Sequence, residues 1–345
     1  MNMMKALLAT EVHKVGIREV PIPDIKDDEV LIEVAYAGIC ASDLHAYNGL
    51  HTFRKPPVIL GHEVSGTIVK KGPNVENLEI GDMVTAIPVV TCLECEWCKQ
   101  GKPQMCAKKI NAGIKGWVGT FVEYFNAPAN WVVKAPKGVD MKTFVLAEPL
   151  SVAVHGLNQI PPDYRERLVI IGTGAIGSMA VIAAKAMGFK RIIAVDIDDT
   201  KLERALISGA ERAVHNEREN LEQAVIENFG MEKATGVLIT APHENVFVDA
   251  VHSIGIGGFV STISSLSTPR PFILADFNTA EATLIGSHSY NNDEFHQAVK
   301  ILSENVEAFT PLVSHVFPKE KIQDAFDLIV EKRETFFKVV MDMKH

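Results

Sequence analysis

The sequence predicts an α/β protein in which a partly open β-barrel domain is interrupted by a doubly wound parallel sheet. Three observations support this fold class. Residues 1 to about 150 contain short alternating apolar segments separated by Gly, Pro and Asn, which is typical of antiparallel β-structure. From about Arg167, apolar strands alternate with helical segments, which is typical of a parallel sheet covered on both faces. The segment after about Gly286 is too short to form its own core, so we expect it to pack on the first domain.

The expected elements follow in chain order. In the first half we expect strands at residues 29–38, 64–72 and 121–128, together with one long loop that carries cysteines. The parallel sheet is expected to use strands at residues 167–172, 191–196, 213–216, 235–241, 257–264 and 282–287. Helices are expected between them at residues 175–188, 198–209, 220–230 and 246–254. In the last segment we expect helices at 293–306 and 319–333 and a terminal strand at 337–342.

Composition excludes several classes of protein. The chain has 345 residues, 47% hydrophobic and 22% charged, which are ordinary values for a globular protein of two or three domains. Its 34 basic and 43 acidic residues give a net charge of −9, which argues against nucleic acid or an anionic membrane as the main partner. The N-terminus lacks a signal peptide, and the one segment that resembles a membrane span, Leu168 to Ala184, is shorter than the ~20 apolar residues required. We therefore predict a cytoplasmic protein.

A glycine-rich turn predicts a dinucleotide site. Gly172, Gly174 and Gly177 form the pattern G-x-G-x-x-G, with Ala175 and Ile176 at its variable positions. The pattern follows a predicted strand and opens a predicted helix, which is the context that a dinucleotide-binding turn requires. The first glycine permits the tight turn, the second lets the backbone approach a pyrophosphate, and the third lets helix and strand pack closely. The alternative is a glycine turn that closes an ordinary βαβ unit.

An acidic residue at the end of the next predicted strand indicates which dinucleotide binds. Asp196 follows Gly172 at close to the ~20 residues expected for a carboxylate that binds a ribose 2′-hydroxyl. The same carboxylate would repel a 2′-phosphate, and no Arg follows it directly. The sequence therefore predicts NAD rather than NADP.

Four of the five cysteines lie on one short loop. Cys92, Cys95, Cys98 and Cys106 have the spacing C-x2-C-x2-C-x7-C, which matches a closed tetrahedral zinc site. Such a site stabilises a loop that lacks its own core and leaves no position open for substrate. The alternatives are a redox pair or two disulfides, which a reducing cytoplasm disfavours.

The fifth cysteine belongs to a second candidate metal site. Cys40 lies in GICASDLHAYNG, His62 and Glu63 follow Gly61, and Glu148 lies in the apolar segment LAEPLSVAVHG, where an unpaired carboxylate would be costly. A Cys, a His and a carboxylate can bind zinc and leave one position open. A lone cysteine is also often a small buried apolar residue, so spacing alone leaves both interpretations open.

These features together resemble the medium-chain, zinc-dependent alcohol and polyol dehydrogenase family over essentially the whole chain. Residues 61–75, GHEVSGTIVKKGPNV, fit its signature G-H-E-x2-G-x5-G-x2-V at every fixed position. The segment EPLSVAVHG resembles the sorbitol dehydrogenase-like branch. The resemblance implies a GroES-like catalytic domain of residues 1–152 and 287–345, with an inserted NAD-binding Rossmann domain of residues 153–286. It also implies two zinc ions per chain.

The resemblance further implies individual roles. Cys40, His62 and Glu148 would surround the catalytic zinc, with Glu63 as a further ligand or its neighbour. Ser42 and His45 match positions that relay the substrate proton, and Asp43 would orient a zinc ligand. In the cofactor half, Lys201 falls where many relatives place a basic residue near the adenosine ribose.

The implied function is hydride transfer from a secondary alcohol, such as a polyol, sugar acid or sugar-alcohol phosphate, to NAD. Ser289 and Ala46 stand where sorbitol dehydrogenases usually have Arg and Tyr, which disfavours sorbitol itself. Alternatives are an L-threonine or 2,3-butanediol-type dehydrogenase and, from another class, a catalytically silent protein that binds zinc and nucleotide. Relatives extend their sheets across dimers, so a homodimer or homotetramer is expected by resemblance.

Overall fold

The chain divides into two compact units in a computed structural model that describes residues 2–114, 116–264 and 268–345. The first unit is formed by Met1–Glu148 and Asn291–His345, and the second by Pro149–Tyr290. Helix α4 (Ala147–Asn158) begins in the first unit and continues into the second. No helix among the described residues is long and apolar enough to span a membrane.

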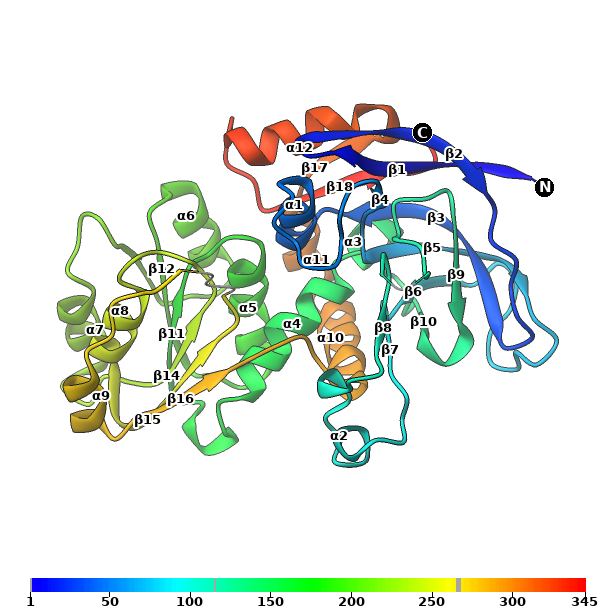
Figure 1. The fold of residues 1–345 in the computed structure, drawn as a ribbon. Coiled ribbons are helices and arrows are strands. Elements are labelled where there is room, and N and C mark those ends of the chain that lie inside the picture. Colours follow the sequence, from blue (N-terminus) through cyan, green and yellow to red (C-terminus); the bar gives the residue numbers. More distant parts are fainter. Residues whose placement is uncertain (1, 115, 265–267) are drawn as a thin grey trace. The chain divides into compact units, whose positions relative to one another are not determined.

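The first unit is mainly antiparallel β-structure (Figure 1). Its strands are β1 (Met3–Glu11), β2 (Lys14–Pro21), β3 (Glu29–Gly38), β4 (Val58–Ile59), β5 (Glu63–Lys71), β6 (Met83–Ala86), β7 (Val89–Val90), β8 (Ile110–Asn111), β9 (Tyr124–Pro128), β10 (Val132–Lys134), β17 (Val313–Pro318) and β18 (Lys338–Asp342). Its helices are α1 (Ala41–Tyr47), α2 (Glu96–Lys99), α3 (Met141–Phe144), α10 (Asn292–Glu304), α11 (Val306–Phe309) and α12 (Ile322–Glu331).

One sheet joins the two sequence segments of the first unit. Its strand order is β10-β6-β5-β3-β18-β17, and β9 also pairs with β3. Strand β18, near the end of the chain, pairs antiparallel with β3, so the last segment completes the sheet of the first half. The apolar faces bury a core around Ile32, Phe121, Phe125 and Phe326.

The second unit is a doubly wound parallel sheet of order β13-β12-β11-β14-β15-β16. Its strands are β11 (Arg167–Ile171), β12 (Arg191–Asp196), β13 (Arg212–His215), β14 (Ala234–Ile239), β15 (Ile254–Thr262) and β16 (Thr283–Gly286). Its further helices are α5 (Ala175–Ala186), α6 (Asp199–Ile207), α7 (Leu221–Phe229), α8 (Val246–Ser253) and α9 (Leu274–Ala280). Figure 1 shows α5 and α6 on one side of this sheet and α7, α8 and α9 on the other. The predicted fold class is therefore confirmed.

Helix α9 is one of the elements that the sequence pattern did not predict. Strands β15 and β16 are parallel, so the chain must cross over between them, and α9 lies in that crossover. The helix has no buried residue and ends at Glu281, whose φ of 45° is left-handed. Without a buried apolar face it carries no periodic signal.

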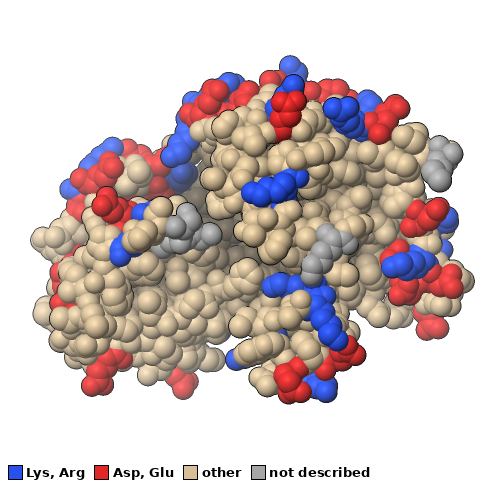
Figure 2. Space-filling view, in the orientation of Figure 1, with Lys and Arg blue, Asp and Glu red and all other residues tan. Residues whose placement is uncertain are grey.

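The surface carries charges of both signs. On the face shown in Figure 2, Lys and Arg side chains are interspersed with Asp and Glu. The acidic excess is a property of the whole sequence, 43 acidic against 34 basic residues.

Candidate functional site

Cys40 and His62 lie at one end of the large sheet because of the register of β3 and β5. These antiparallel strands pair Gly38, the last residue of β3, with Glu63, the first residue of β5. Cys40 follows β3 as the N-terminal cap of α1, and His62 immediately precedes β5. Gly38 is required at this point, since a Cβ there would overlap the Glu63 carboxylate. The sheet therefore brings the two sequence motifs to a common place.

Cys40, His62 and Glu63 fit a metal ion. One ligand atom from each lies within 4.8 Å of the others. His62 Nδ1 and Glu63 Oε2 are buried without a hydrogen-bond partner, which is uncommon for buried polar atoms. Burial lowers the pKa of His62, but the negative charges of Cys40 and Asp43 outweigh it and raise this pKa well above its ordinary value. The site thus favours a cation, and its thiolate, imidazole and carboxylate are zinc ligands.

Asp43 joins the segments around this set and is fully buried. Its carboxylate accepts hydrogen bonds from the backbone N–H of Cys40 at 3.0 Å and of Gly61 at 3.1 Å. Its Oδ1 lies 3.6 Å from Nη1 of Arg54 and 3.7 Å from Nδ1 of His62. Burial would raise the pKa of Asp43, but His62, Arg54 and the Cys40 amide lower it to about 2. The carboxylate therefore stays ionised beside His62.

Lys338, on β18, is a residue of this site that sequence analysis missed. Its Nζ lies 2.5 Å from Oε1 of Glu63, and both side chains are buried. Burial lowers the pKa of Lys338, but Glu63, Cys40 and Glu148 together raise it. Glu148 itself is buried in the first turn of α4, outside the set of three ligand atoms. The available signal was a lysine within a buried apolar strand, because a buried lysine requires an acidic partner.

Ser42 and His45 lie on α1, three residues apart and therefore on one side of the helix. Ser42 is half-buried, and its Oγ accepts a hydrogen bond from Nη1 of Arg54 at 3.4 Å. His45 is exposed. The structure thus places a half-buried hydroxyl and an exposed imidazole on the same helix.

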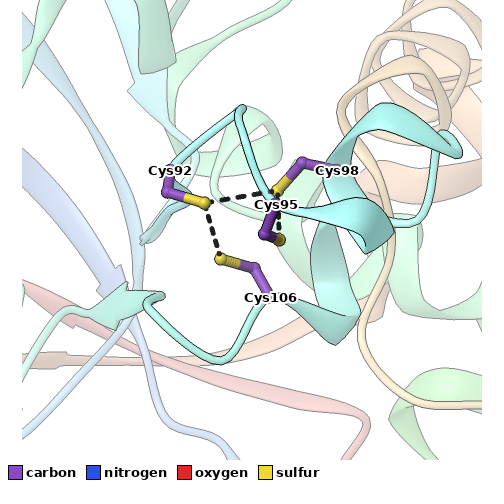
Figure 3. Close-up of side chains that lie close together, drawn as sticks. All are labelled: Cys92, Cys95, Cys98 and Cys106. Atoms are coloured by element: carbon purple, nitrogen blue, oxygen red, sulfur yellow. Dashed lines mark hydrogen bonds between the residues drawn. The ribbon is translucent and has the colours of Figure 1, made fainter.

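The cysteine loop gathers its four sulfurs in one place, as Figure 3 shows. The Sγ–Sγ distances are 3.4 Å for Cys92 and Cys106, 3.5 Å for Cys95 and Cys98, and 3.9 Å for Cys92 and Cys98. All four are free cysteines. Disulfide sulfurs lie ~2.05 Å apart, whereas a tetrahedral zinc site with Zn–S bonds of ~2.3 Å separates its sulfurs by about 3.8 Å. Backbone amides of Glu94 and Cys95 lower the pKa of Cys92 to about 6, whereas burial and the neighbouring sulfurs raise the pKa of Cys98 to about 11.

Replacing Cys106 with serine is expected to release the metal of this loop. Cys106 is buried at 1% exposure, and the loop has only short elements such as α2 around its cysteines. We expect one zinc fewer per chain and a melting temperature lower by roughly 5–10 °C, which corresponds to a loss of about 3 kcal/mol. Metal analysis and calorimetry measure both, and retention of the full zinc content would contradict the assignment.

The glycine turn has the geometry of a dinucleotide loop. Gly172 has φ of +95°, which an L side chain rarely adopts, and it connects β11 to α5. Gly174 caps α5, and a Cβ there would meet no atom within 4 Å, so its surroundings are open. A Cβ on Gly177 would overlap the carbonyl oxygen of Gly172. Ala175 and Ile176 form the first turn of α5, whose N-terminus attracts anions.

Asp196 ends β12 beside this turn. Its Oδ2 accepts hydrogen bonds from Thr173 N at 2.7 Å and Thr173 Oγ1 at 3.1 Å, and its Oδ1 accepts one from Ile197 N at 2.8 Å. The carboxylate is thus fixed against the glycine loop. Lys201 lies in the first turn of α6, with Nζ 3.9 Å from Oδ2 of Asp198.

Comparison with known proteins agrees with these sites. The chain matches the family models of the alcohol dehydrogenase GroES-like domain over residues 26–137 and of zinc-binding dehydrogenase over residues 175–304. The sorbitol dehydrogenase of Bombyx mori is 30% identical over 333 residues, which cover 92% of this chain and 92% of that protein. The chain belongs to the medium-chain zinc-dependent alcohol dehydrogenase family.

Solved structures of related proteins are similar to this dehydrogenase over nearly its whole length. Galactitol-1-phosphate dehydrogenase from Escherichia coli is 27% identical, with a TM-score of 0.89 and coverage of 99% of this chain and 100% of that one. A protein described as a short chain alcohol dehydrogenase from Escherichia coli CFT073, complexed with NADH, is 29% identical, with a TM-score of 0.90 and the same coverage. The dehydrogenase thus combines a structural zinc site at its four-cysteine loop with a catalytic-type site at Cys40, His62 and Glu63.

Proposed function

We propose that this dehydrogenase transfers a hydride from a secondary hydroxyl of a polyol, sugar acid or sugar-alcohol phosphate to NAD. The observation that carries the proposal is the set of Cys40, His62 and Glu63, in which Nδ1 of His62 and Oε2 of Glu63 are buried without a hydrogen-bond partner. We include Glu148 as a further residue of this zinc site. The names of sorbitol dehydrogenase and galactitol-1-phosphate dehydrogenase among its relatives support the substrate class.

A zinc ion held by these residues would act as a Lewis acid on the substrate hydroxyl and favour its ionised form. NAD would accept the hydride, and the protein supplies position and charge. Ser42 accepts the hydroxyl proton as it releases its own, which leaves to solvent through the cofactor ribose or through the exposed His45 on the same helix. Asp43 holds its negative charge beside His62. Lys338 neutralises Glu63 within the buried site.

We assign NAD binding to residues 153–286, with the backbone of Gly172, Gly174 and Gly177 against the pyrophosphate. Gly174 supports this role because a Cβ built on it would meet no atom within 4 Å, which leaves room for a ligand. Asp196 binds the adenosine ribose and Lys201 lies near it, in the proposed arrangement. The Asp196 carboxylate disfavours the 2′-phosphate of NADP by repulsion.

Replacing Asp196 with asparagine is expected to reduce the preference of the enzyme for NAD over NADP. Asparagine keeps an oxygen that can accept from Thr173 N, but it removes the charge. We expect kcat/KM for NAD to fall about 10- to 100-fold relative to that for NADP, because hydrogen bonds to charged groups contribute about 1.5–3 kcal/mol. Initial rates with both cofactors measure the ratio, and an unchanged ratio would refute the role of Asp196.

The direct test of function is a metal count followed by a panel of substrates. The proposal expects two zinc ions per chain and zinc-dependent reduction of NAD by a polyol, sugar acid or sugar-alcohol phosphate. L-threonine and 2,3-butanediol belong in the panel, since faster turnover of either would place the enzyme with those dehydrogenases. No turnover of any secondary alcohol at full zinc content would favour a silent binding protein.

We also propose that two copies pair along the edge of the six-stranded sheet. Strand β16 lies at this edge, and its residue Leu284 is 40% exposed. An open edge strand presents unpaired backbone groups to a second chain. Light scattering tests the proposal, and a mass of one chain at micromolar concentration would contradict it.

A further inference from the structure

Arg54 is a buried cation that has no role in the proposed hydride transfer or proton relay. It is 5% exposed and lies in the segment between α1 and β4. Its Nη2 donates to the carbonyl oxygen of Ala112 at 2.9 Å, and its Nη1 lies 3.4 Å from Oγ of Ser42 and 3.6 Å from Oδ1 of Asp43. An arginine is rarely buried to this extent unless it is paired.

The backbone provides a dedicated slot for this guanidinium. Gly113 has φ of +79°, and a Cβ there would lie 3.2 Å from Nε of Arg54 and 3.3 Å from the carbonyl oxygen of Ile59. Nε has no hydrogen-bond partner, and a side chain at position 113 would crowd it. The glycine therefore gives the side chain room to extend between Ala112 and Ser42.

The segment that carries Arg54 is fixed to the helix of the proposed proton relay. Nδ1 of His51 accepts the backbone N–H of Phe53 at 3.2 Å and of Arg54 at 3.1 Å. The backbone N–H of His51 in turn donates to the carbonyl oxygen of His45 at 3.0 Å. Burial and the charge of Arg54 lower the pKa of His51, so its ring stays neutral and able to accept. These hydrogen bonds fix the backbone of Arg54 relative to helix α1, which carries Ser42 and His45.

The contact with Ser42 has a defined direction. A guanidinium can only donate, so Ser42 must accept from Arg54 with one lone pair of its Oγ. The hydroxyl proton of Ser42 then points away from Arg54. The second lone pair remains available to accept another proton, and the nearby positive charge makes the hydroxyl a better donor.

We propose that Arg54 is a positioning residue that orients the Ser42 hydroxyl for proton transfer. The inference rests on the proposed function, in which Ser42 takes up the substrate proton. Arg54 acts through Ser42 and does not itself contact the substrate. It fixes which way the hydroxyl of Ser42 donates and which lone pair is free to accept.

The test combines Arg54→Met with Ser42→Ala in a double-mutant cycle on the zinc-loaded enzyme. We expect Arg54→Met to lower kcat by about 10- to 100-fold, the range found when a residue that hydrogen-bonds to a functional group and orients it is replaced. The KM for NAD and the zinc content should stay unchanged, and the solvent deuterium isotope effect on kcat should rise. In the Ser42→Ala background Arg54→Met should have little further effect, because the hydroxyl it orients is gone.

Lys55 provides the matched control. It is the next residue, also basic, but it is exposed and donates only to the carbonyl oxygen of Gly49 at 2.8 Å in the described contacts. Lys55→Met should leave kcat and the isotope effect as in the wild type. An equal loss in Lys55→Met would show a general effect of charge and overturn the inference.

Three further results would overturn it. The first is an unchanged kcat in Arg54→Met, and the second is a loss that is equally large in the Ser42→Ala background. The third is loss of zinc in both Arg54→Met and Arg54→Gln, which would assign Arg54 to the metal site through Asp43. If Ser42→Ala alone keeps full turnover, the relay in the proposed function fails as well, which separates that failure from one of Arg54 alone.

Discussion

Cys40→Ser is expected to abolish turnover in a chain that remains folded. The Cys40 thiolate is one of three donors in the set with His62 and Glu63, and a serine hydroxyl is a much weaker zinc ligand. Lewis-acid stabilisation by a metal contributes several kcal/mol, so we expect kcat to fall about 10³-fold or more. Serine is a preferred residue at helix N-caps, so α1 should still begin at this position.

The readouts for Cys40→Ser are kcat, zinc content and circular dichroism. One zinc per chain should remain, bound by the four-cysteine loop, and the melting temperature should change little. Cys106→Ser is the matched control, because it is the same substitution at a cysteine of the other cluster and should act mainly on stability. Wild-type turnover in Cys40→Ser, with two zinc ions bound, would refute the role of Cys40.

The sequence predicted the residues of the site that lie in compact motifs. Spacing alone left the role of Cys40 open, and Cys40, His62 and Glu63 could be proposed as ligands because their segments resemble those of the dehydrogenase family. The cysteine loop and the glycine turn are equally local, and the structure brings each of them together as expected. The parallel sheet was predictable for a related reason, since its strands are continuous apolar runs.

The partners of these residues were missed because they come from remote segments. Lys338 pairs with Glu63 across 275 positions of sequence, and only the register of β18 on β3 brings them together. Arg54 is close to Ser42 in sequence, yet an arginine is ordinarily expected at the surface. A charged residue carries no sign of whether its partner is water or a buried group. Periodicity therefore predicts the apolar core more readily than the buried charges that sit in it.

Lys338→Met is expected to be strongly destabilising, although methionine keeps an apolar chain of similar length to the aliphatic part of lysine. The substitution leaves the buried carboxylate of Glu63 without its cation, and breaking a buried ion pair in this way costs about 3–5 kcal/mol. Glu63→Gln should show a similar loss, since it leaves the ammonium group of Lys338 buried. Urea unfolding monitored by circular dichroism measures both.

The double variant Glu63→Gln/Lys338→Met separates burial of an unpaired charge from simple loss of packing. Replacing both members of a buried pair with neutral groups of similar size is often close to neutral, so we expect the double variant to recover most of the lost stability. The side chain at position 338 is closely surrounded, because a Cβ on Gly38 would lie 3.0 Å from Cε of Lys338. A double variant as unstable as the sum of the single losses would show that packing, not charge, is responsible.

The pH dependence gives an independent check on the same pair. The pKa of Lys338 is raised in the folded chain, so its contribution to stability is fully present below the ordinary lysine pKa of 10.5. That contribution is lost only as pH rises through the higher folded-state pKa. The difference in unfolding free energy between the wild type and Lys338→Met should therefore stay constant from about pH 6 to about pH 9. A difference that disappears within this range would mean that Lys338 is neutral in the folded protein and that Glu63 is balanced by another group.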